Sequence, residues 1–331
     1  MTRGGMTTLG TTADSAQEPV AGGDPRARRE RLTSAMAQVN EILLGKESQV
    51  ELAFACLLAR GHLLIEDLPG VGKTTLAHAL ATALGAGYQR IQFTSDLMPA
   101  DILGVSIYRR DQEAFEFHPG PIFADVVLAD EVNRATPKTQ SALLEAMAEG
   151  QVTIEGQTHA LPNPFFVIAT QNPVDLVGTF PLPDSQLDRF LLSISLGFPD
   201  PEVERRLLMS EDRSELLKRA QPCLALDELR ALQTDCERVH VSEPLLAYVQ
   251  ALLAETRNSR WFEIGLSPRA GLALLRCARA HAFLQGRDFV APEDIKTVFP
   301  GLARHRMTVS HGLEASVEDQ VTSLLEQVAL P

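Results

Sequence analysis

One short segment constrains the fold of this 331-residue chain more than any other part of it. Residues 63–66 are apolar apart from a closing glutamate, and a turn with Gly70 and Gly72 leads from them to Lys73 and Thr74. The stretch that follows has leucines on one helical face, at Leu76, Leu80 and Leu84. A buried strand, a glycine turn and a helix in this order are the context of a Walker A phosphate-binding loop. We therefore expect an α/β fold with a nucleotide site at this turn.

The chemistry of this loop suggests a role for each kind of residue. Gly70 and Gly72 let the backbone curl so that successive N–H groups point at phosphate oxygens, assisted by the helix N-terminus. Lys73 would reach the β- and γ-phosphates, and the Thr74 hydroxyl would ligate Mg²⁺. Asp67 stands where the pattern normally has its first glycine, and we expect its carboxylate to face away from the phosphates. The alternative is a glycine-rich turn without nucleotide. The predicted nucleotide contacts of the loop are Pro69, Gly70, Val71, Gly72, Lys73, Thr74 and Thr75.

A second apolar run ends in two adjacent carboxylates. Asp130 and Glu131 follow the apolar residues 126–129, which is the Walker B arrangement. Asp130 would hold Mg²⁺ through water, while Glu131 would point to the other side of the strand end and activate the attacking water as a general base. In isolation such a pair could equally be a solvated turn. Its place downstream of a Walker A loop favours the catalytic interpretation.

Two further polar residues stand at positions suited to phosphate chemistry. Asn172 follows the apolar run Phe165–Thr170 at a proline turn, where its amide could orient the attacking water. Arg269 lies in the first turn of a helix that Ser267 and Pro268 would open, which is an unfavourable end of the helix dipole for a cation. We therefore expect an anionic partner for Arg269, the γ-phosphate. The alternative is a surface arginine tied to a nearby carboxylate.

Candidate strands alternate with helical patterns as far as Phe198, and only helical patterns follow it. The candidate strands are His62–Glu66, Gln89–Phe93, Ala124–Asp130 and Phe165–Thr170. Their apolar character predicts a parallel sheet with helices on both faces. Helices are expected to begin at Asp200-Pro201, Ser267-Pro268 and Ala291-Pro292. The sequence thus predicts a disordered leader at residues 1–30, an α/β core at 31–198 and an all-helical C-terminal domain at 199–331.

Composition disfavours some classes of function. The 30 Lys+Arg against 43 Asp+Glu give a formal net charge of −13, which argues against a general nucleic-acid-binding face, although not against a local basic pore. Cys56, Cys223, Cys236 and Cys277 lie far apart without metal-ligand spacing, and we expect reduced, mostly buried thiols. The N-terminus lacks a signal-like pattern and no apolar run is long enough to span a bilayer. We therefore expect a cytoplasmic protein without membrane insertion.

Longer strings of residues resemble one known family. They lie in and between the two nucleotide motifs and near the C-terminus, at Glu66–Thr74, Arg90–Thr94, Asp101–Gly104, Gly120–Phe123, Ala129–Ala135, Pro137–Glu149, Ala169–Pro173, Phe180–Phe190 and Val298–Arg306. Over most of its length the chain is similar to the MoxR family of AAA+ ATPases. The resemblance implies an AAA+ P-loop core with a helical lid, ATP and Mg²⁺ as cofactors, and a homohexameric ring. It also implies a chaperone-like ATPase that remodels or activates a protein client, often beside a protein with a von Willebrand factor A domain.

The same resemblance suggests roles for individual residues. Asn172 matches the sensor-1 residue of AAA+ proteins. Arg189, expected on a short helix, matches the arginine finger presented to a neighbouring subunit; the alternative is pairing with an aspartate on its own surface. Arg269 matches the sensor-2 arginine of a lid that closes over the nucleotide. Leu44 and Gly45 resemble the segment that lies over adenine.

Two hairpins inserted into the core are also expected from the resemblance, at Ile102–Phe117 and Gln151–Leu161. The turn at Glu155-Gly156, between apolar strand residues, supports the second hairpin directly. In such rings these hairpins face the pore or the partner, so we expect them to contact the client. The alternative is two hairpins that simply face solvent.

Three other functions remain open at this point. A P-loop kinase would need an acceptor pocket and no arginine from a neighbour. A DNA-directed AAA+ motor or loader would need basic, aromatic pore loops, for which Arg109 and Arg110 are the only local hint. A nucleotide-dependent scaffold would bind ATP with little turnover, which the presence of Glu131 disfavours. A ring ATPase with a protein client is the leading hypothesis, and nucleic acid is not expected as its partner.

Overall fold

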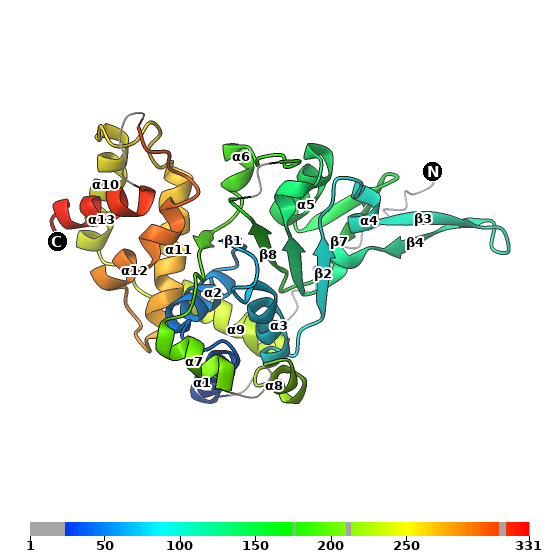
Figure 1. The fold of residues 1–331 in the computed structure, drawn as a ribbon, viewed down its shortest axis with the longest axis horizontal. Coiled ribbons are helices and arrows are strands. Elements are labelled where there is room, and N and C mark those ends of the chain that lie inside the picture. Colours follow the sequence, from blue (N-terminus) through cyan, green and yellow to red (C-terminus); the bar gives the residue numbers. More distant parts are fainter. Residues whose placement is uncertain (1–23, 175–176, 210–212, 311–315, 331) are drawn as a thin grey trace, which may run out of the picture.

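The computed structural model describes residues 24–174, 177–209, 213–310 and 316–330. Figure 1 shows a central sheet with a group of helices on one side of it. The helices are α1 (Pro25–Ile42), α2 (Glu47–Leu58), α3 (Lys73–Ala83), α4 (Pro99–Leu103), α5 (Pro137–Glu149), α6 (Asp184–Leu187), α7 (Pro201–Met209), α8 (Arg213–Arg219), α9 (Leu226–Glu237), α10 (Glu243–Asn258), α11 (Pro268–Leu284), α12 (Pro292–Ala303) and α13 (Val317–Gln327). Two short 3₁₀ turns are η1 (Pro121–Phe123) and η2 (Val132–Arg134).

The core is built on one parallel sheet. Its strands are β1 (Leu63–Glu66), β2 (Tyr88–Gln92), β5 (Val126–Asp130), β8 (Phe166–Gln171) and β9 (Leu192–Ile194), in the spatial order β2-β5-β8-β1-β9. Every pairing in it is parallel. The predicted parallel sheet is therefore confirmed, with small shifts at the strand ends. The prediction lacks β9, because three residues are too few to show a strand pattern.

The two faces of the sheet are buried by different helices. One face packs against α1, α2 and α3, and the other packs against α5. The exception is β2, whose Gln89, Arg90 and Gln92 are exposed. The expectation that helices cover both faces of every strand is therefore wrong for β2, an edge strand of the sheet, whose polar side chains remain exposed.

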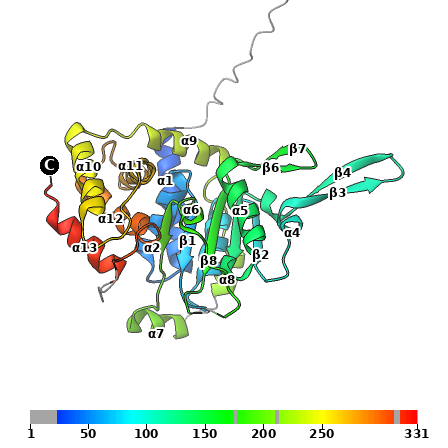
Figure 2. The same ribbon diagram turned by 90° about the horizontal axis from the view of Figure 1, so that it is seen from above.

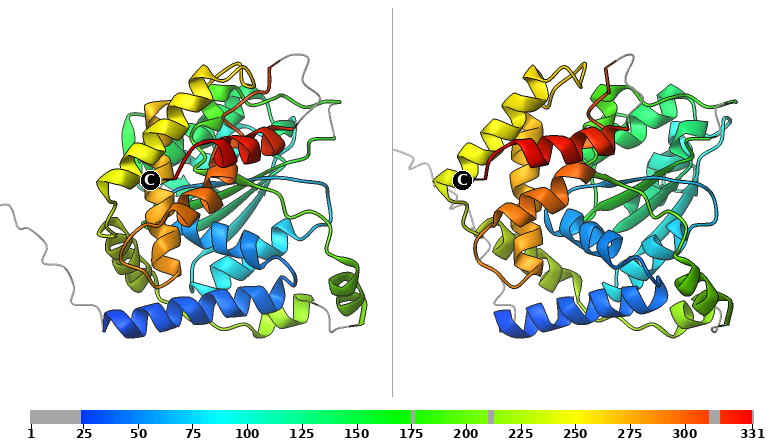
Figure 3. Two further views of the ribbon diagram at one scale, coloured as in Figure 1. Left: turned by 90° about the vertical axis from the view of Figure 1, so that its left-hand side faces the viewer. Right: turned by 60° about the vertical axis from the view of Figure 1, so that its left-hand side comes forward.

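The C-terminal helices share one apolar core with the sheet face that carries α1, α2 and α3. α11 packs on α2, and α12 packs on β9. Helices α8 and α9 fall within the predicted C-terminal domain, 199–331, yet α8 contacts α1 and α3, and α9 contacts α1 and α2. Figure 3 shows α1 running along the base of the molecule. Residues on both sides of position 199, the predicted domain boundary, therefore pack into one apolar core.

Helix α1 begins inside the segment predicted as a disordered leader, residues 1–30. The Asp24 side chain accepts the N–H of Arg26 at 3.0 Å, and Pro25 occupies the first helical position. A capping aspartate followed by proline is a standard start for a helix. The predicted end of the leader is thus corrected to precede residue 24, and residues 1–23 lie outside the described part.

Both expected hairpins are present. The first pairs β3 (Gly104–Arg109) with β4 (Ala114–Pro119), and the second pairs β6 (Gln151–Ile154) with β7 (Gln157–Ala160). They project from the same side of the core (Figure 2). Phe117 of the first stacks on His159 of the second, with 3.9 Å between ring centroids. The two hairpins are therefore in contact with each other.

The four cysteines are free thiols, and all but the partly buried Cys223 are buried. Burial raises the pKa of the Cys277 thiol to about 12. These thiols agree with the expectation of reduced, mostly buried cysteines. Among the helices that the structure describes, none combines the length and the apolar character needed to cross a membrane.

Candidate active site

The phosphate-binding loop joins β1 to α3 and has a left-handed backbone at both of its glycines. Gly70 has a φ of 84° and Gly72 a φ of 103°. Residues with a Cβ rarely adopt these values. A Cβ on Gly72 would also come within 2.9 Å of the Leu43 side chain. The loop conformation therefore depends on glycine at these positions, as the phosphate-binding interpretation requires.

Lys73 and Thr74 form the first turn of α3, directly after the loop. The Lys73 side chain is buried, and its Nζ donates to the Asp67 carbonyl oxygen at 2.7 Å. Burial lowers the pKa of Lys73, and the carboxylates of Asp130, Asp67 and Glu131 act against that shift. Thr74 is exposed at the same helix end. The structure thus brings the predicted lysine near both predicted carboxylates.

The two carboxylates at the end of β5 are organised by Thr170 of the neighbouring β8. Thr170 Oγ1 donates to Asp130 Oδ1 at 2.6 Å and accepts the backbone N–H of Glu131 at 2.9 Å. Glu131 has a φ of 58°, so the chain turns sharply between the two acidic residues. Asp130 is buried and Glu131 is partly exposed. The two adjacent carboxylates therefore differ in burial and in backbone conformation at the end of β5.

Two residues of β2 that the prediction overlooked contact these carboxylates. Arg90 donates to Asp130 Oδ2 through Nη2 at 2.6 Å and through Nε at 3.2 Å. Gln92 Nε2 donates to Glu131 Oε2 at 2.9 Å, and Arg90 Nη2 also donates to Gln92 Oε1 at 3.0 Å. Arg134 pairs with Glu131 at 3.1 Å. The polar residues of β2 were the only sign in the sequence that this strand contributes to the site. That sign was not sufficient, because only the order of strands in the sheet shows that β2 lies beside β5.

The oxygen donors at this end of the sheet fit a magnesium ion. Thr74 offers a hydroxyl and Asp130 a carboxylate, which are hard ligands of the kind Mg²⁺ takes beside phosphate and water. Among the described residues no cluster of three or more His, Cys, Asp and Glu side chains forms a self-sufficient metal cage. Thr74 and Asp130 would hold the ion together with phosphate and water oxygens.

Removing the Arg90 side chain should favour metal binding. Arg90→Gln removes a guanidinium that would have to leave Asp130 if this carboxylate is to turn to a metal, as the sequence predicts. Because the Arg90 side chain is 47% exposed, the pair contributes only about 0.2–1 kcal/mol. We therefore expect the Mg²⁺ concentration for half-maximal ADP binding to fall by a factor of about 1.4 to 5. Titration calorimetry measures it. Arg109→Gln, which breaks a comparably exposed pair with Glu116, is the control and should leave the value unchanged.

The remaining predicted residues of this end lie around the loop. Asn172 follows β8, is buried, and accepts the N–H of Val174 at 3.2 Å through Oδ1. Leu44 and Gly45 lie between α1 and α2, next to Leu43, whose side chain occupies the space that a Cβ on Gly72 would need. The predicted adenine segment is therefore adjacent to the phosphate loop.

A basic pocket lies at the opposite end of the sheet, among residues that precede β1 and β9. It has a volume of about 160 Å³, and its lining includes Arg60, Asp188, Arg189, Arg269, Arg276 and Arg306. Asp188 pairs with Arg306 at 2.7 Å and with Arg269 at 3.8 Å. Arg189 Nη1 donates to the Leu144 carbonyl oxygen at 3.0 Å, and its buried Nε has no hydrogen-bond partner within the described ranges. A single carboxylate in this lining faces an excess of arginines.

Two expectations about these arginines need correction. Arg189 does not lie on the short helix α6, which ends at Leu187. Arg269 does not lie over the phosphate loop of its own chain. The pocket is at the amino end of the strands and the loop at the carboxyl end, and the four residues of β1 alone separate them by about 13 Å. The reason is the docking of α11 on α2 and of α12 on β9, which turns the start of α11 toward Arg189.

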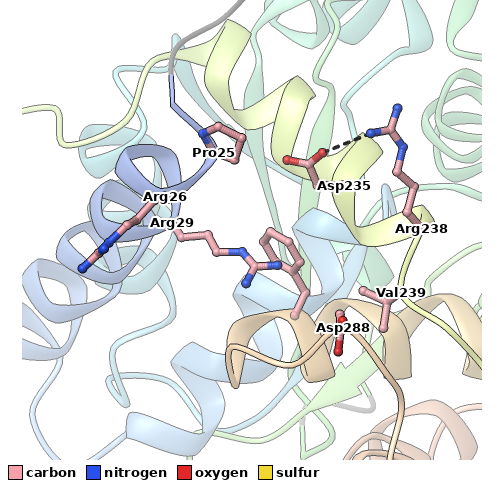
Figure 4. A pocket seen from close by; sticks show the side chains of 8 residues that line it. Pro25, Arg26, Arg29, Asp235, Arg238, Val239 and Asp288 are labelled. Atoms are coloured by element: carbon pink, nitrogen blue, oxygen red, sulfur yellow. Dashed lines mark ion pairs between the residues drawn. The ribbon is translucent and has the colours of Figure 1, made fainter.

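Another pocket, of about 420 Å³, lies between α1, α9 and α11 (Figure 4). Arg29 points into it from α1, with its guanidinium 4.2 Å from the Phe283 ring centroid. Asp235 pairs with Arg238 at the end of the same helix, at 3.8 Å, and with Arg28 of α1 at 3.1 Å. The pocket contains none of the predicted nucleotide residues.

The sheet, the phosphate loop, the paired acidic residues and the helical lid together define an AAA+ ATPase. Residues 62–192 match the model of the ATPase family associated with various cellular activities (AAA), and residues 254–326 match the AAA lid domain. The chain is 39% identical over 342 residues to Chaperone MoxR1 of Mycobacterium tuberculosis, covering 99% of this chain and 90% of that protein. It belongs to the MoxR family of AAA+ ATPases.

Two further comparisons agree with this membership. The uncharacterized protein YeaC of Bacillus subtilis is 43% identical over 305 residues, covering 91% of this chain and 95% of that one. The crystal structure of a protein from Cytophaga hutchinsonii, described as a candidate ATPase, superposes with a TM-score of 0.82 at 35% identity. That match covers 92% of this chain and 96% of the other. The likeness therefore extends over the core and the lid together.

Proposed function

We propose that this chain hydrolyses ATP in a closed ring of its own copies and uses the energy to remodel a protein client. The observation that carries the proposal is the basic pocket with Arg189 and Arg269. Its arginines outnumber its carboxylates, and it lies across the sheet from the phosphate loop of the same chain. An anion supplied by a neighbouring subunit would satisfy it. A head-to-tail ring places one subunit's pocket at the next subunit's nucleotide.

The residues around the loop divide the chemical work. The loop from Pro69 to Thr75 would hold the phosphates, with Lys73 releasing the Asp67 carbonyl to reach them. Glu131 would accept a proton from the attacking water, and Asn172 would orient that water. Thr74 and Asp130 would hold Mg²⁺, which neutralises developing charge on the phosphates when bound.

The Glu131 carboxylate would have to break two contacts before it could act as a base. Its carboxylate is held by Gln92 at 2.9 Å and by Arg134 at 3.1 Å. A base engaged by two donors is less available to a water, so we propose that these contacts keep hydrolysis slow until the nucleotide is fully bound. The arginines of the neighbouring subunit would then complete the site.

The dependence of ATPase rate on protein concentration tests this proposal. Shared sites exist only in the assembly, so the rate per subunit should rise steeply with concentration and level off where sedimentation shows that the ring is complete. A rate per subunit that stays constant across a dilution series spanning dissociation would exclude the shared site. It would leave an isolated P-loop enzyme, such as a kinase.

The first hairpin is the proposed site of client contact. Tyr108 and Phe115 are 50% and 66% exposed, and their rings form an edge-to-face pair with centroids 5.3 Å apart. Val105 and Ile107 on the same hairpin are also exposed. An exposed apolar surface on a projecting element is typical of an interaction site. This supports binding of an extended apolar polypeptide rather than a phosphate backbone, and Arg109 is already paired with Glu116 at 2.6 Å.

Substitution of the two aromatic residues should weaken client binding selectively. Tyr108→Ala with Phe115→Ala removes two large apolar side chains, each with a burial free energy of about 1.5–3 kcal/mol. We expect at least about a tenfold loss of affinity for reduced, carboxymethylated lactalbumin, measured by fluorescence anisotropy, with basal ATPase activity retained. Phe289→Ala, an exposed aromatic residue on the lid, is the matched control. Unchanged affinity in the double variant would place the client elsewhere.

The family resemblance extends the proposal to partners and location. We propose six subunits in the ring, a cytoplasmic location, and cooperation with a protein that contains a von Willebrand factor A domain. A DNA-directed motor is the competing possibility. Stimulation of hydrolysis by single-stranded DNA but not by unfolded protein would favour it.

A further inference from the structure

Asp67, the residue that departs from the phosphate-loop pattern, is bound to a segment beyond β9. Its Oδ2 accepts the backbone N–H of Leu196 at 2.6 Å, that of Gly197 at 2.7 Å and the Ser195 hydroxyl at 2.9 Å. Its Oδ1 accepts the N–H of Leu68 at 2.8 Å. The expectation that this carboxylate faces away from the phosphates agrees with these contacts. What the sequence did not suggest is a specific partner for it.

Asp67 is buried, at 7% exposed, and its carboxylate forms no ion pair among the described residues, although the charge of Lys73 lies nearby. Burial raises the pKa of the Asp67 carboxyl, but the hydrogen bonds from Gly197, Leu68, Ser195 and Leu196 outweigh burial and hold that pKa below its ordinary value. Hydrogen bonds to a buried charged group are strong, and losing them is costly. The contact is therefore a firm attachment between the phosphate loop and residues 195–197.

Residues 195–197 connect the sheet to everything that follows. They leave β9 and lead through Phe198 to α7, the first helix after the sheet. Lys46 Nζ donates to the Phe198 carbonyl oxygen at 3.0 Å, and Gly45 lies against Val203 of α7. The linker thus touches the loop and the predicted adenine segment. Figure 1 shows α7 at the opposite end of β9 from α6, on the side where α3 lies.

The other end of the same residue contacts the nucleotide-binding lysine. The Asp67 carbonyl oxygen accepts Lys73 Nζ at 2.7 Å, while its carboxylate holds the linker. Lys73 must move away from this carbonyl to reach a phosphate. Asp67 therefore contacts Lys73 through its carbonyl oxygen and residues 195–197 through its carboxylate.

We propose that Asp67 is a positioning residue that transmits the occupancy of the phosphate loop to the linker between the sheet and the lid. The proposal rests on the proposed function only in requiring that the loop binds nucleotide. When Lys73 turns to the phosphates, the Asp67 carboxylate loses a neighbouring cation and binds the linker amides more tightly. Residues 195–197 are then hydrogen-bonded more tightly when the loop is occupied than when it is empty. The position of α7, which follows them, changes accordingly.

Hydrogen exchange with ADP as the probe tests the transmission without requiring turnover. In the wild type, ADP should slow exchange at the amides of Leu196 and Gly197 as well as in the loop. In Asp67→Gly, which restores the usual loop residue, these two amides should exchange faster by on the order of ten- to a hundred-fold, with or without ADP. Asp67→Asn keeps an acceptor oxygen and should recover part of the protection and of its response to ADP.

The matched control is Asp125→Gly, which removes another carboxylate that accepts a backbone N–H, that of Gly87 at 2.8 Å, outside the loop. It should leave the ADP response of Leu196 and Gly197 intact. Protection of the loop amides by ADP with no change at these two residues in the wild type would overturn the transmission and leave nucleotide binding standing. Absence of ADP binding by the wild type would instead overturn the proposed function.

Discussion

Glu131→Gln should abolish steady-state ATP hydrolysis while leaving ATP binding intact. The amide cannot accept a proton from water, and a positioned general base contributes about 10²–10⁴ in rate. Binding should persist because Glu131 is not among the predicted loop contacts, and its backbone N–H still donates to Thr170. A steady-state assay of phosphate release measures hydrolysis, and calorimetric titration with ATP measures binding.

Glu145→Gln is the control for this substitution, because Glu145 is an exposed residue of α5 that the site does not use. Its rate should equal that of the wild type. Hydrolysis by Glu131→Gln at more than about a tenth of the wild-type rate would remove Glu131 from the chemistry. Asp130 would then be the carboxylate to examine next.

Arg189→Ala should lower hydrolysis by about 10³–10⁵, the range for an arginine supplied to a phosphoryl-transfer site. The loss should be partly recovered when Arg189→Ala subunits are mixed with Glu131→Gln subunits. Each variant is defective in a different half of the shared site, so some interfaces in the mixed ring combine two intact halves. The measurement is ATPase rate against the fraction of each variant at constant total protein.

Arg238→Ala serves as the control, since Arg238 is an exposed arginine of the pocket between α1, α9 and α11. Arg238→Ala should have the wild-type ATPase rate, and mixing it with Glu131→Gln subunits should produce no recovery of the kind expected for Arg189→Ala. A mixture whose rate never exceeds the sum of its separate components would show that Arg189 acts only within its own chain. Its bond to the Leu144 carbonyl oxygen would then be its main role.

Much of the fold follows from local patterns, and the failures have physical causes. The apolar runs ending at Glu66 and Asp130 and the helix start at Ser267 are local signals, and each corresponds to an element of the structure. The three-residue strand at Leu192 has no comparable signal. It exists because β1 offers it a partner and α12 covers it.

The candidate site shows the same division between local and tertiary information. Lys73, Asp130 and Glu131 could be predicted because the phosphate chemistry is encoded within short strings. Arg90 and Gln92 could not, since their role depends on which strand neighbours β5. The position of Arg269 depends on how a helix docks on a distant one. No feature of the residues around it reveals which end of the sheet it will reach.

The separation of the phosphate loop and the arginine pocket at opposite ends of the sheet has an arithmetic consequence for assembly. If neighbouring subunits share their sites as proposed, an open row of subunits has one terminal loop without arginines and one terminal pocket without a nucleotide. The number of complete sites is then always one fewer than the number of chains, and closure alone makes the two numbers equal. The number of active sites would thus equal the number of interfaces between subunits. A missing or inactive subunit would also inactivate the site of its neighbour.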